Sequence, residues 1–206
     1  QAGAASSQIR AIGGGGNPIT NAMDYITIAA TGNAVDYGDL TVARQSPNAA
    51  ASSTRMIFMA GKVSPGTTNV ADYVTIATTG NASDFGDCTT AVRLSSACSN
   101  STRVIKAGGD FNPTSDNVTD VIEFFTISTQ GNGIDFGNLS VARTEFASCS
   151  SPTRAVFAGG SNPSPTNFNT MDYVQIASTG NAVDFGDLNT ATAFRPGGTS
   201  NAHGGL

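Results

Sequence analysis

The sequence predicts an all-β fold made of four copies of one unit, and three observations support this. The chain has 24 glycines among its 206 residues and only 12% charged residues, a composition that suits many turns and argues against long surface helices. Several segments alternate β-branched or aromatic residues with polar ones, which is the period of a strand. One ten-residue stretch recurs four times, as TGNAVDYGDL at 31–40, TGNASDFGDC at 79–88, QGNGIDFGNL at 130–139 and TGNAVDFGDL at 179–188.

The repeat combines parts of fixed length with one variable part. The marker aromatics of the recurring stretch are 48, 51 and 49 residues apart; they are Tyr37, Phe85, Phe136 and Phe185. Each marker follows another Tyr or Phe by 12 residues and precedes an Arg by 18, except that His203 replaces the last Arg. Only the stretch from this Arg to the next Tyr or Phe changes length. We therefore expect that stretch to contain a surface loop.

Four strands are predicted in each unit, in a constant order. The first is made of small residues, as in NAAASS and SACSNS, and the second is a short apolar segment ending in glycine, as in RMIFMAG and RAVFAGG. The third alternates in the manner of DYVTIAT and DYVQIAS. The Gly-Asn pair that follows suits a tight hairpin turn, after which AVDYGDL and its copies return as the fourth strand.

A four-stranded antiparallel unit repeated around an axis is a blade of a β-propeller, so the chain is predicted to be a single four-bladed propeller. A solenoid is the alternative, although its repeats usually contain fewer strands. The small first strands favour the propeller because innermost strands crowd around the axis; Cys98 and Cys149 occupy the slot that holds Ala5 and Ala50 in the first two repeats. The predicted repeats are approximately 1–44, 45–93, 94–143 and 144–195, with 196–206 as a partial fifth repeat or closing strand.

Each unit also resembles a kelch repeat. The likeness lies in a second strand ending in Gly-Gly (AVFAGG), a third opening on Tyr (MDYVQI) and a turn leading into an aromatic residue (GNAVDF), although Phe or Tyr stands where kelch repeats usually have Trp. The string GNAVDFGDL is similar to kelch-like repeats in virion proteins of tailed phages of marine bacteria, of the cyanophage type. This resemblance implies a virion structural protein, part of a phage tail or tail fibre, in an extracellular particle with other virion proteins as partners.

Charge and cysteine content argue against several classes of function. The net charge of −5 disfavours nucleic acid as a partner. No apolar run approaches the ~20 residues that span a bilayer, so no membrane insertion is expected. The three cysteines, which include Cys88, form no CxxC pair and read as small buried thiols. We expect no cofactor and no bound metal.

Charged residues follow the repeat and are predicted to be structural. The repeated charges are Arg10, Arg55, Arg103 and Arg154 with Asp36, Asp84, Asp135 and Asp184. A ring of such charges around an axis is one way to bind an anion or a metal. The simpler interpretation is an Arg–Asp hydrogen bond in each blade that pins a loop to its neighbour. A catalytic site needs unlike groups converging on one point, so we expect no catalytic residue among them.

Calcium and histidine chemistry are also disfavoured. The oxygen-bearing residues Asn33, Asp36 and Asp39 invite a calcium site, but positions i and i+3 of a strand face opposite sides. His203 is the only histidine and lacks a placed nucleophile, so no triad is indicated.

Binding is predicted in the variable loops that follow the second strands. The candidate ligand-binding residues are Lys62, Asp110, Phe111, Asn112, Asn162 and Phe168. An exposed aromatic ring beside Asn and Asp is compatible with contact to a sugar. Ordinary solvated turns of differing length remain the alternative.

Three functions remain open from the sequence. The chain is expected to be a non-enzymatic receptor-binding or adhesion module that reads a carbohydrate or protein on the host surface. A purely structural scaffold or decoration subunit, joined to its neighbours as a homo-oligomer or with other virion proteins, is the alternative. An enzyme such as a glycoside hydrolase needs two carboxylates in unlike environments, and the acids outside the repeat pattern are few: Asp110, Asp116, Asp120 and Glu145.

Overall fold

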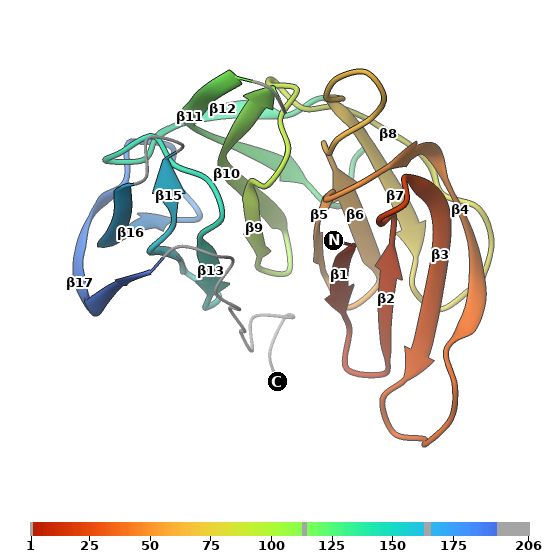
Figure 1. Cartoon of the computed structure of the whole chain (residues 1–206). Helices are drawn as coiled ribbons and strands as arrows, with labels where there is room; N and C mark the ends of the chain where they lie inside the picture. Colours follow the sequence, from red (N-terminus) through yellow and green to blue (C-terminus); the bar gives the residue numbers. More distant parts are fainter. Residues whose placement is uncertain (1, 113–114, 163–165, 193–206) are drawn as a thin grey trace.

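Strands make up all the regular structure of the chain within its described residues. The structure is a computed structural model that describes residues 2–112, 115–162 and 166–192. Its strands form four antiparallel sheets (Figure 1). Each sheet lies within one of the four sequence repeats. The all-β prediction is therefore confirmed, and we call the four sheets blades 1 to 4 in chain order.

Each blade contains four main strands in the same chain order. Blade 1 contains β1 (Gly3–Ser6), β2 (Arg10–Gly14), β3 (Thr20–Thr27) and β4 (Val35–Arg44). Blade 2 contains β5 (Asn48–Ala51), β6 (Arg55–Met59), β7 (Val70–Thr75) and β8 (Ser83–Asp87). Blade 3 contains β9 (Ser96–Ser99), β10 (Arg103–Asn112), β11 (Ser115–Thr126) and β12 (Ile134–Asn138). Blade 4 contains β13 (Ala147–Ser150), β14 (Arg154–Ala158), β15 (Ser161–Asn162), β16 (Thr166–Gln175) and β17 (Val183–Thr192), where β15 is a short extension that pairs only with β16.

The first strands of successive blades pack against one another, and their small side chains allow this. Strand β5 lies between β1 and β9, and β9 lies next to β13. The Ser96 hydroxyl of β9 donates to the Ser148 Oγ of β13 at 2.7 Å. Cys98 pairs with Ile105 in the register in which Ala50 pairs with Ile57, so it occupies the predicted small-residue slot.

A β-bulge in every blade explains why the marker aromatic is followed by glycine. In blade 1, Gly38 pairs with Met23 and Asp36 pairs with Asp24, which leaves Tyr37 as the extra residue between them. The same shift occurs in the other three blades. The glycine after the marker has a positive φ of 131–142° in all four. A bulge re-aims a side chain, and here it directs the marker ring toward the following blade.

Backbone contacts join each blade to the next at this bulge. The amide of Gly80 donates to the Tyr37 carbonyl at 2.7 Å, and the amide of Ala82 donates to the Asp39 carbonyl at 2.8 Å. Equivalent pairs of bonds join blades 2 and 3 and blades 3 and 4. A Cβ on Gly38 would lie 2.5 Å from the Gly80 carbonyl group, so the approach requires glycine.

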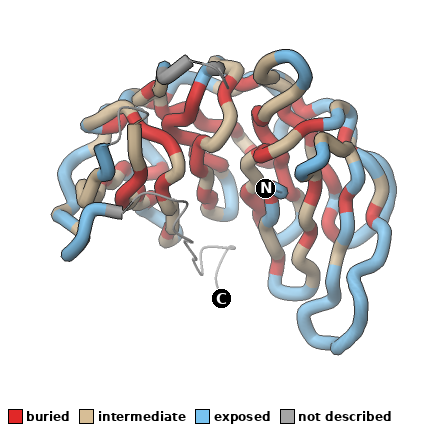
Figure 2. The backbone as a smooth tube through the Cα atoms, in the orientation of Figure 1, coloured by how far each residue is buried: buried red, intermediate tan, exposed pale blue. Residues whose placement is uncertain are grey.

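The hydrophobic core lies between blades. One cluster combines Tyr37 and Leu40 of blade 1 with Val74 and Ile76 of blade 2. A second joins blades 2 and 3 through the aromatic pair Phe85 and Phe125, and a third joins blades 3 and 4. Figure 2 shows buried residues concentrated where consecutive blades face each other. Each blade is thus stabilised mainly by its neighbours.

The four blades form an arc around one axis, and its two ends are open. In Figure 1, blade 1 and blade 4 are the ends of this arc. The marker Phe185 of blade 4 is 48% exposed, whereas Tyr37, Phe85 and Phe136 are each 2% exposed. The described residues of blade 4 therefore lack a following blade over their outer face. The proposed closing segment 196–206 lies outside the described residues.

Candidate functional site

The arginines at the start of the second strands are structural, and three of the four bond to a carbonyl oxygen of the next blade. Arg10 lies over the Tyr25 ring, with its guanidinium carbon 4.6 Å from the ring centroid, and donates to the Ile76 carbonyl of the next blade at 2.9 Å. Arg55 and Arg103 repeat both contacts with their own ring and the next blade. Arg154 keeps the ring contact with Tyr173. Arg10, Arg55 and Arg103 therefore cross-link consecutive blades.

The acids predicted to pair with these arginines are instead exposed. They are Asp36, Asp84, Asp135 and Asp184. They lie beside the bulge on the outer strand, where the sheet faces solvent. The expected bond between the two sets of repeated charges is thus not formed within the described chain, and Arg10, Arg55 and Arg103 bond to main-chain oxygens of the next blade instead.

Different charges form the ion pairs between blades. Arg44 pairs with Asp72, and Arg143 pairs with Asp172 at 2.9 Å, with all four side chains fully buried. Burial lowers the pKa of Arg44 and of Arg143, and burial raises the pKa of Asp72 although the nearby Arg44 charge opposes this. Both arginines occupy a second repeated slot, seven residues after the marker aromatic, which is the sequence signal for these pairs.

Blade 3 uses another arrangement, because the arginine of the preceding blade, Arg93, lies one residue beyond the slot that Arg44 and Arg143 occupy. Lys106 pairs with Glu123 at 2.6 Å inside the blade, and the Thr89 amide of blade 2 also donates to Glu123. Arg93 bonds instead to Asp110 at 2.9 Å. The buried charges are therefore paired and structural at all three junctions between blades.

The cysteines have the environment of inert core residues. All three are free thiols. Burial raises the pKa of Cys88 and of Cys98 to about 12, so neither is a thiolate at neutral pH. The prediction of small buried thiols is confirmed for these two, while Cys149 is only half-buried.

The variable loops of blades 2 and 3 are tied to each other. The backbone of Lys62 forms an isolated antiparallel β-bridge with Thr67 across the blade 2 loop, and a second one with Gln45. The Thr67 hydroxyl donates to the Phe111 carbonyl of blade 3 at 2.8 Å and to the Ala91 carbonyl at 3.0 Å. These bonds join the loops of two blades into one fixed surface, which we call the loop face.

The predicted ligand-binding residues occupy unequal positions on this surface. Phe111 is 37% exposed at the end of β10. Asp110 is 6% exposed and its carboxylate is held by Arg93. Its side chain therefore stabilises the loop and is largely shielded from solvent. Lys62 is half-buried.

Blade 4 carries two of the predicted residues at a distance along the arc. Asn162 and Phe168 are half-buried, and the Phe168 amide donates to the Gly160 carbonyl at 2.9 Å. The side chain of Asn112 is outside what the structure describes. Lys62 and Phe111 thus lie on neighbouring loops, which Thr67 joins. No signal in the sequence pointed to Thr67.

The described residues contain no group of three or more His, Cys, Asp or Glu side chains able to hold a metal ion. No helix in this part of the chain is long and apolar enough to cross a membrane. His203 and the side chain of Asp116 lie outside the described residues.

Comparison with known proteins reveals the fold. No protein-family profile matches the chain, and no curated protein matches its sequence. Many solved structures resemble it, among them YjhT, with a TM-score of 0.76 at 10% sequence identity. The likeness covers 92% of this chain and 66% of the YjhT chain, so the four blades superpose on about two-thirds of a longer protein. YjhT is a kelch β-propeller, and this chain therefore has a β-propeller fold, with four kelch-like blades in its described residues.

Proposed function

We propose that the chain is a non-enzymatic binding module of a phage virion whose loop face binds a carbohydrate or protein on the host surface. The observation that carries this is the Thr67 hydroxyl bond to the Phe111 carbonyl, which fixes the blade 2 and blade 3 loops as one surface. The placement in a virion, in a tail or fibre, depends on the resemblance of the repeats to those of marine tailed-phage proteins.

The loop face has the chemistry of a sugar-binding surface. The Phe111 ring is partly exposed and offers an apolar face for stacking on a sugar. Lys62 lies in the neighbouring loop and supplies hydrogen-bond donors. Arg93 holds Asp110, the residue before Phe111, so the strand end that carries the ring is anchored to blade 2. A pre-ordered surface binds without a large loss of conformational entropy.

Binding is favoured over catalysis because the carboxylates at the three junctions between blades are already paired. Hydrolysis of a glycoside needs one carboxylic acid and one carboxylate facing a shared space. Asp72 and Asp172 are buried against arginines, and Asp110 is engaged by Arg93. These residues cannot exchange protons with a substrate without breaking a junction between blades.

The test is binding of the purified chain to an array of bacterial surface oligosaccharides and to whole bacterial cells. Phe111→Ser should abolish saturable binding. Ile134→Ser is the matched control, because Ile134 is also apolar and 55% exposed but lies on the outer strand of blade 3. Equal binding by both variants, or turnover of any bound oligosaccharide, would contradict the proposal.

A scaffold or decoration subunit without its own ligand is the second candidate. The exposed outer face of blade 4 favours it, because an uncovered blade face is suited to contact with another subunit. Absence of binding to every oligosaccharide and cell type, combined with tight association to other virion proteins, would favour this candidate over the first.

A further inference from the structure

The sequence contains a single Asn-Gly pair, Asn132-Gly133, in the recurring stretch of blade 3. The other three repeats have Asn-Ala at this position. An asparagine followed by glycine is especially prone to deamidation, because glycine has no side chain to shield its amide nitrogen from the neighbouring carboxamide. A chemically labile pair therefore lies in the turn between β11 and β12.

The buried acid of the same blade explains why glycine occupies this position. A Cβ on Gly133 would lie 2.6 Å from Oε2 of Glu123 and 3.0 Å from the Phe125 ring. Lys106 and the Thr89 amide both hold the Glu123 carboxylate in place. Glu123 stands where the other blades have Asp, which is one methylene shorter. The labile pair thus accompanies the exchange of Asp for Glu in blade 3.

The junction between blades 2 and 3 holds both groups that take part in deamidation. The side-chain oxygen of Asn132 accepts a hydrogen bond from the Asp87 amide at 3.0 Å. The amide of Gly133 donates to the Asp87 carbonyl at 2.7 Å. We call these two bonds the clamp. Asn132 is exposed to water, but the clamp directs the Gly133 nitrogen toward blade 2 and away from the carboxamide carbon.

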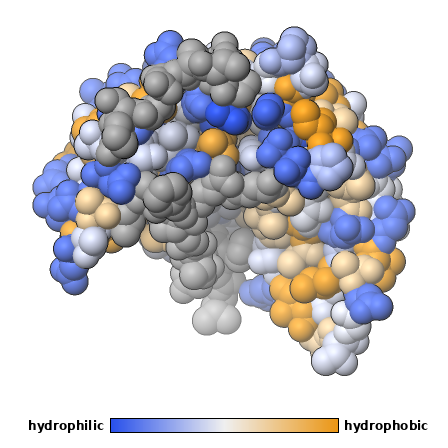
Figure 3. All heavy atoms as spheres, viewed as in Figure 1, coloured by the Kyte–Doolittle hydropathy of each residue, from blue (hydrophilic) through white to orange (hydrophobic). Residues whose placement is uncertain are grey.

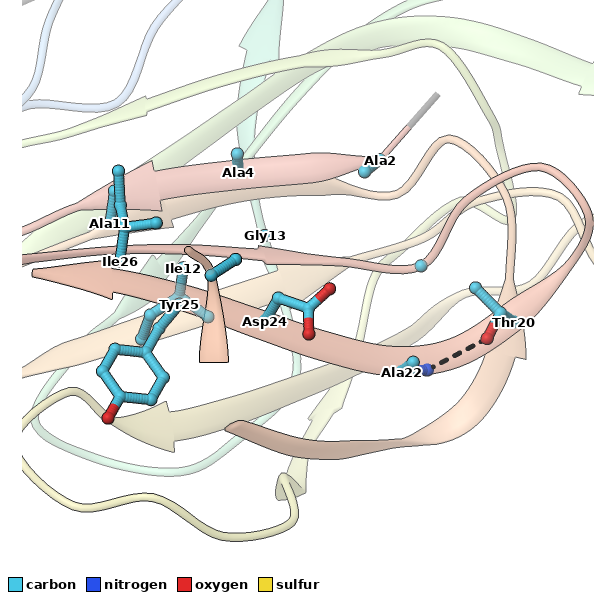
Figure 4. Close-up of a pocket in the computed structure, with 12 residues that line it drawn as sticks. Ala2, Ala4, Ala11, Ile12, Gly13, Thr20, Ala22, Asp24, Tyr25 and Ile26 are labelled. Carbon is cyan, nitrogen blue, oxygen red and sulfur yellow. Dashed lines mark hydrogen bonds between the residues drawn. The ribbon is translucent and has the colours of Figure 1, made fainter. Parts of the chain in front are cut away.

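Blade 1 has the same turn without a clamp. Within the described chain, neither Asn33 nor Ala34 bonds to a preceding blade. The uncovered face beside this turn has a shallow pocket of about 340 Å³, and Tyr25, Ile26 and Ala34 are among the residues that line it (Figure 4). Figure 3 shows hydrophobic side chains at the surface in this part of the molecule, at the lower right. Blade 1 is therefore an internal reference for the unclamped turn.

We propose that Asn132 is a deamidation site whose reaction is controlled by opening of the junction between blades 2 and 3. When the two blades separate, the Gly133 nitrogen attacks Cγ of Asn132, its proton passes to water and ammonia leaves. Water then opens the resulting succinimide ring to aspartate or isoaspartate. In the closed junction the clamp prevents the first step.

The isoaspartate product makes an opening of this junction permanent. Isoaspartate adds a methylene to the main chain between Gly131 and Gly133, whose amides donate to the Phe85 and Asp87 carbonyls at 2.8 and 2.7 Å. The lengthened chain no longer matches the spacing of these two acceptors, so the modified junction is weaker than the original one. This inference does not depend on the proposed function.

Peptide mapping by mass spectrometry tests the reaction after incubation of the purified chain at mildly alkaline pH. Conversion of Asn132 in the folded chain should be at least about tenfold slower than in the free peptide STQGNGIDFG, residues 128–137. Hydrogen exchange at the Gly133 amide should be slowed by the same factor relative to the peptide, because both reactions need the same opening.

Two substitutions that each create a second Asn-Gly pair isolate the effect of the clamp. Ala34→Gly creates the pair in the unclamped turn of blade 1. Ala82→Gly creates it at the junction between blades 1 and 2, where the Asp39 backbone makes the same two bonds at 3.0 and 2.8 Å. Asn33 in the first variant should be converted at least about tenfold faster than Asn81 in the second.

Weakening one junction at a time tests control at Asn132 itself. Arg55 donates to the Ile127 carbonyl across the junction between blades 2 and 3, and Arg10 makes the equivalent bond between blades 1 and 2. Arg55→Met should raise the rate at Asn132 about tenfold, because it removes a hydrogen bond from a charged donor. Arg10→Met is the matched control and should leave that rate unchanged.

Circular dichroism of each variant checks that the strands are retained, and the comparison of deamidation with hydrogen exchange needs no substitution. The proposal would be overturned by conversion of Asn132 in the folded chain at the rate of the free peptide, or by unequal protection against the two reactions. Equal rates at Asn33 and Asn81 in their variants, or equal rates at Asn132 in Arg55→Met and Arg10→Met, would overturn it as well.

Discussion

Glycine follows the marker aromatic in all four repeats, but its surroundings differ in the last one. At Gly137 a Cβ would lie 2.5 Å from the carbonyl oxygen of Gly180, and φ is +142°. At Gly186 the φ of +131° is similar, but among the described residues the nearest atom is a flexible methionine end 3.9 Å away. A comparison of Gly137 with Gly186 therefore separates the effect of backbone strain from the effect of close approach between blades.

We predict that Gly137→Ala lowers the free energy of unfolding much more than Gly186→Ala. Both substitutions carry the strain of a positive φ, about 1–3 kcal/mol. Only Gly137→Ala also forces blades 3 and 4 apart. Urea unfolding of both variants at the same low protein concentration measures the difference, and equal losses would show that the glycine serves the bulge alone.

Tyr37 gives a pH-dependent test of the first junction. Its hydroxyl lies 2.6 Å from the carbonyl oxygens of both Thr75 and Thr78 in blade 2 and shares its one hydrogen between them. Burial raises the pKa of Tyr37 above its usual value. A raised pKa in the folded state means that stability is complete below the unfolded-state pKa of about 10 and is lost as pH rises through the folded-state value.

Tyr37→Phe should therefore change the shape of the stability profile. At pH 7 we expect a loss of about 0.5–1.5 kcal/mol, because Phe fills this slot in the other blades and only the hydrogen bonds disappear. Above pH 10 the variant should lose less stability than the wild type. Parallel profiles in denaturant titrations from pH 7 to 11 would contradict this account of Tyr37.

The strand elements could be predicted from the sequence, whereas the pairing of charges between blades could not. Constant spacings of 12 and 18 residues fix the hairpins, and small residues identify the innermost strand, as Cys98 and Ala50 show. The partner of Arg10 depends instead on how two blades are rotated against each other. That rotation brings the Ile76 carbonyl, and not a carboxylate, within 2.9 Å.

Asp172 tests the importance of the buried ion pair between blades 3 and 4. Asp172→Ala should destabilise the chain by about 3–5 kcal/mol, because it leaves Arg143 charged, buried and without its acid. Asp135→Ala, at an exposed acid of the repeat, should change stability by no more than about 0.5 kcal/mol. Thermal and urea unfolding measure both. Similar effects from the two substitutions would mean that the repeated exposed acids carry the junction after all.

Closure of the whole molecule is the feature that the repeat pattern left undetermined. Four copies of one unit predict four blades, but the number of blades in a full circle depends on the angle between them. That angle is set by contacts such as Gly137 against Gly180 and is not encoded in the spacing of the repeats. The loop face could be located from variable length alone, whereas the Thr67 bond that joins two loops could not.

Hydrogen exchange resolved to single amides tests most directly the claim that each blade is sealed by its neighbour. The recurring stretch supplies four equivalent amides, Gly32, Gly80, Gly131 and Gly180. The last three donate to the preceding blade at 2.7–2.8 Å. In dilute solution we predict slow exchange at these three and fast exchange at Gly32. Equal exchange rates at all four amides would contradict the account.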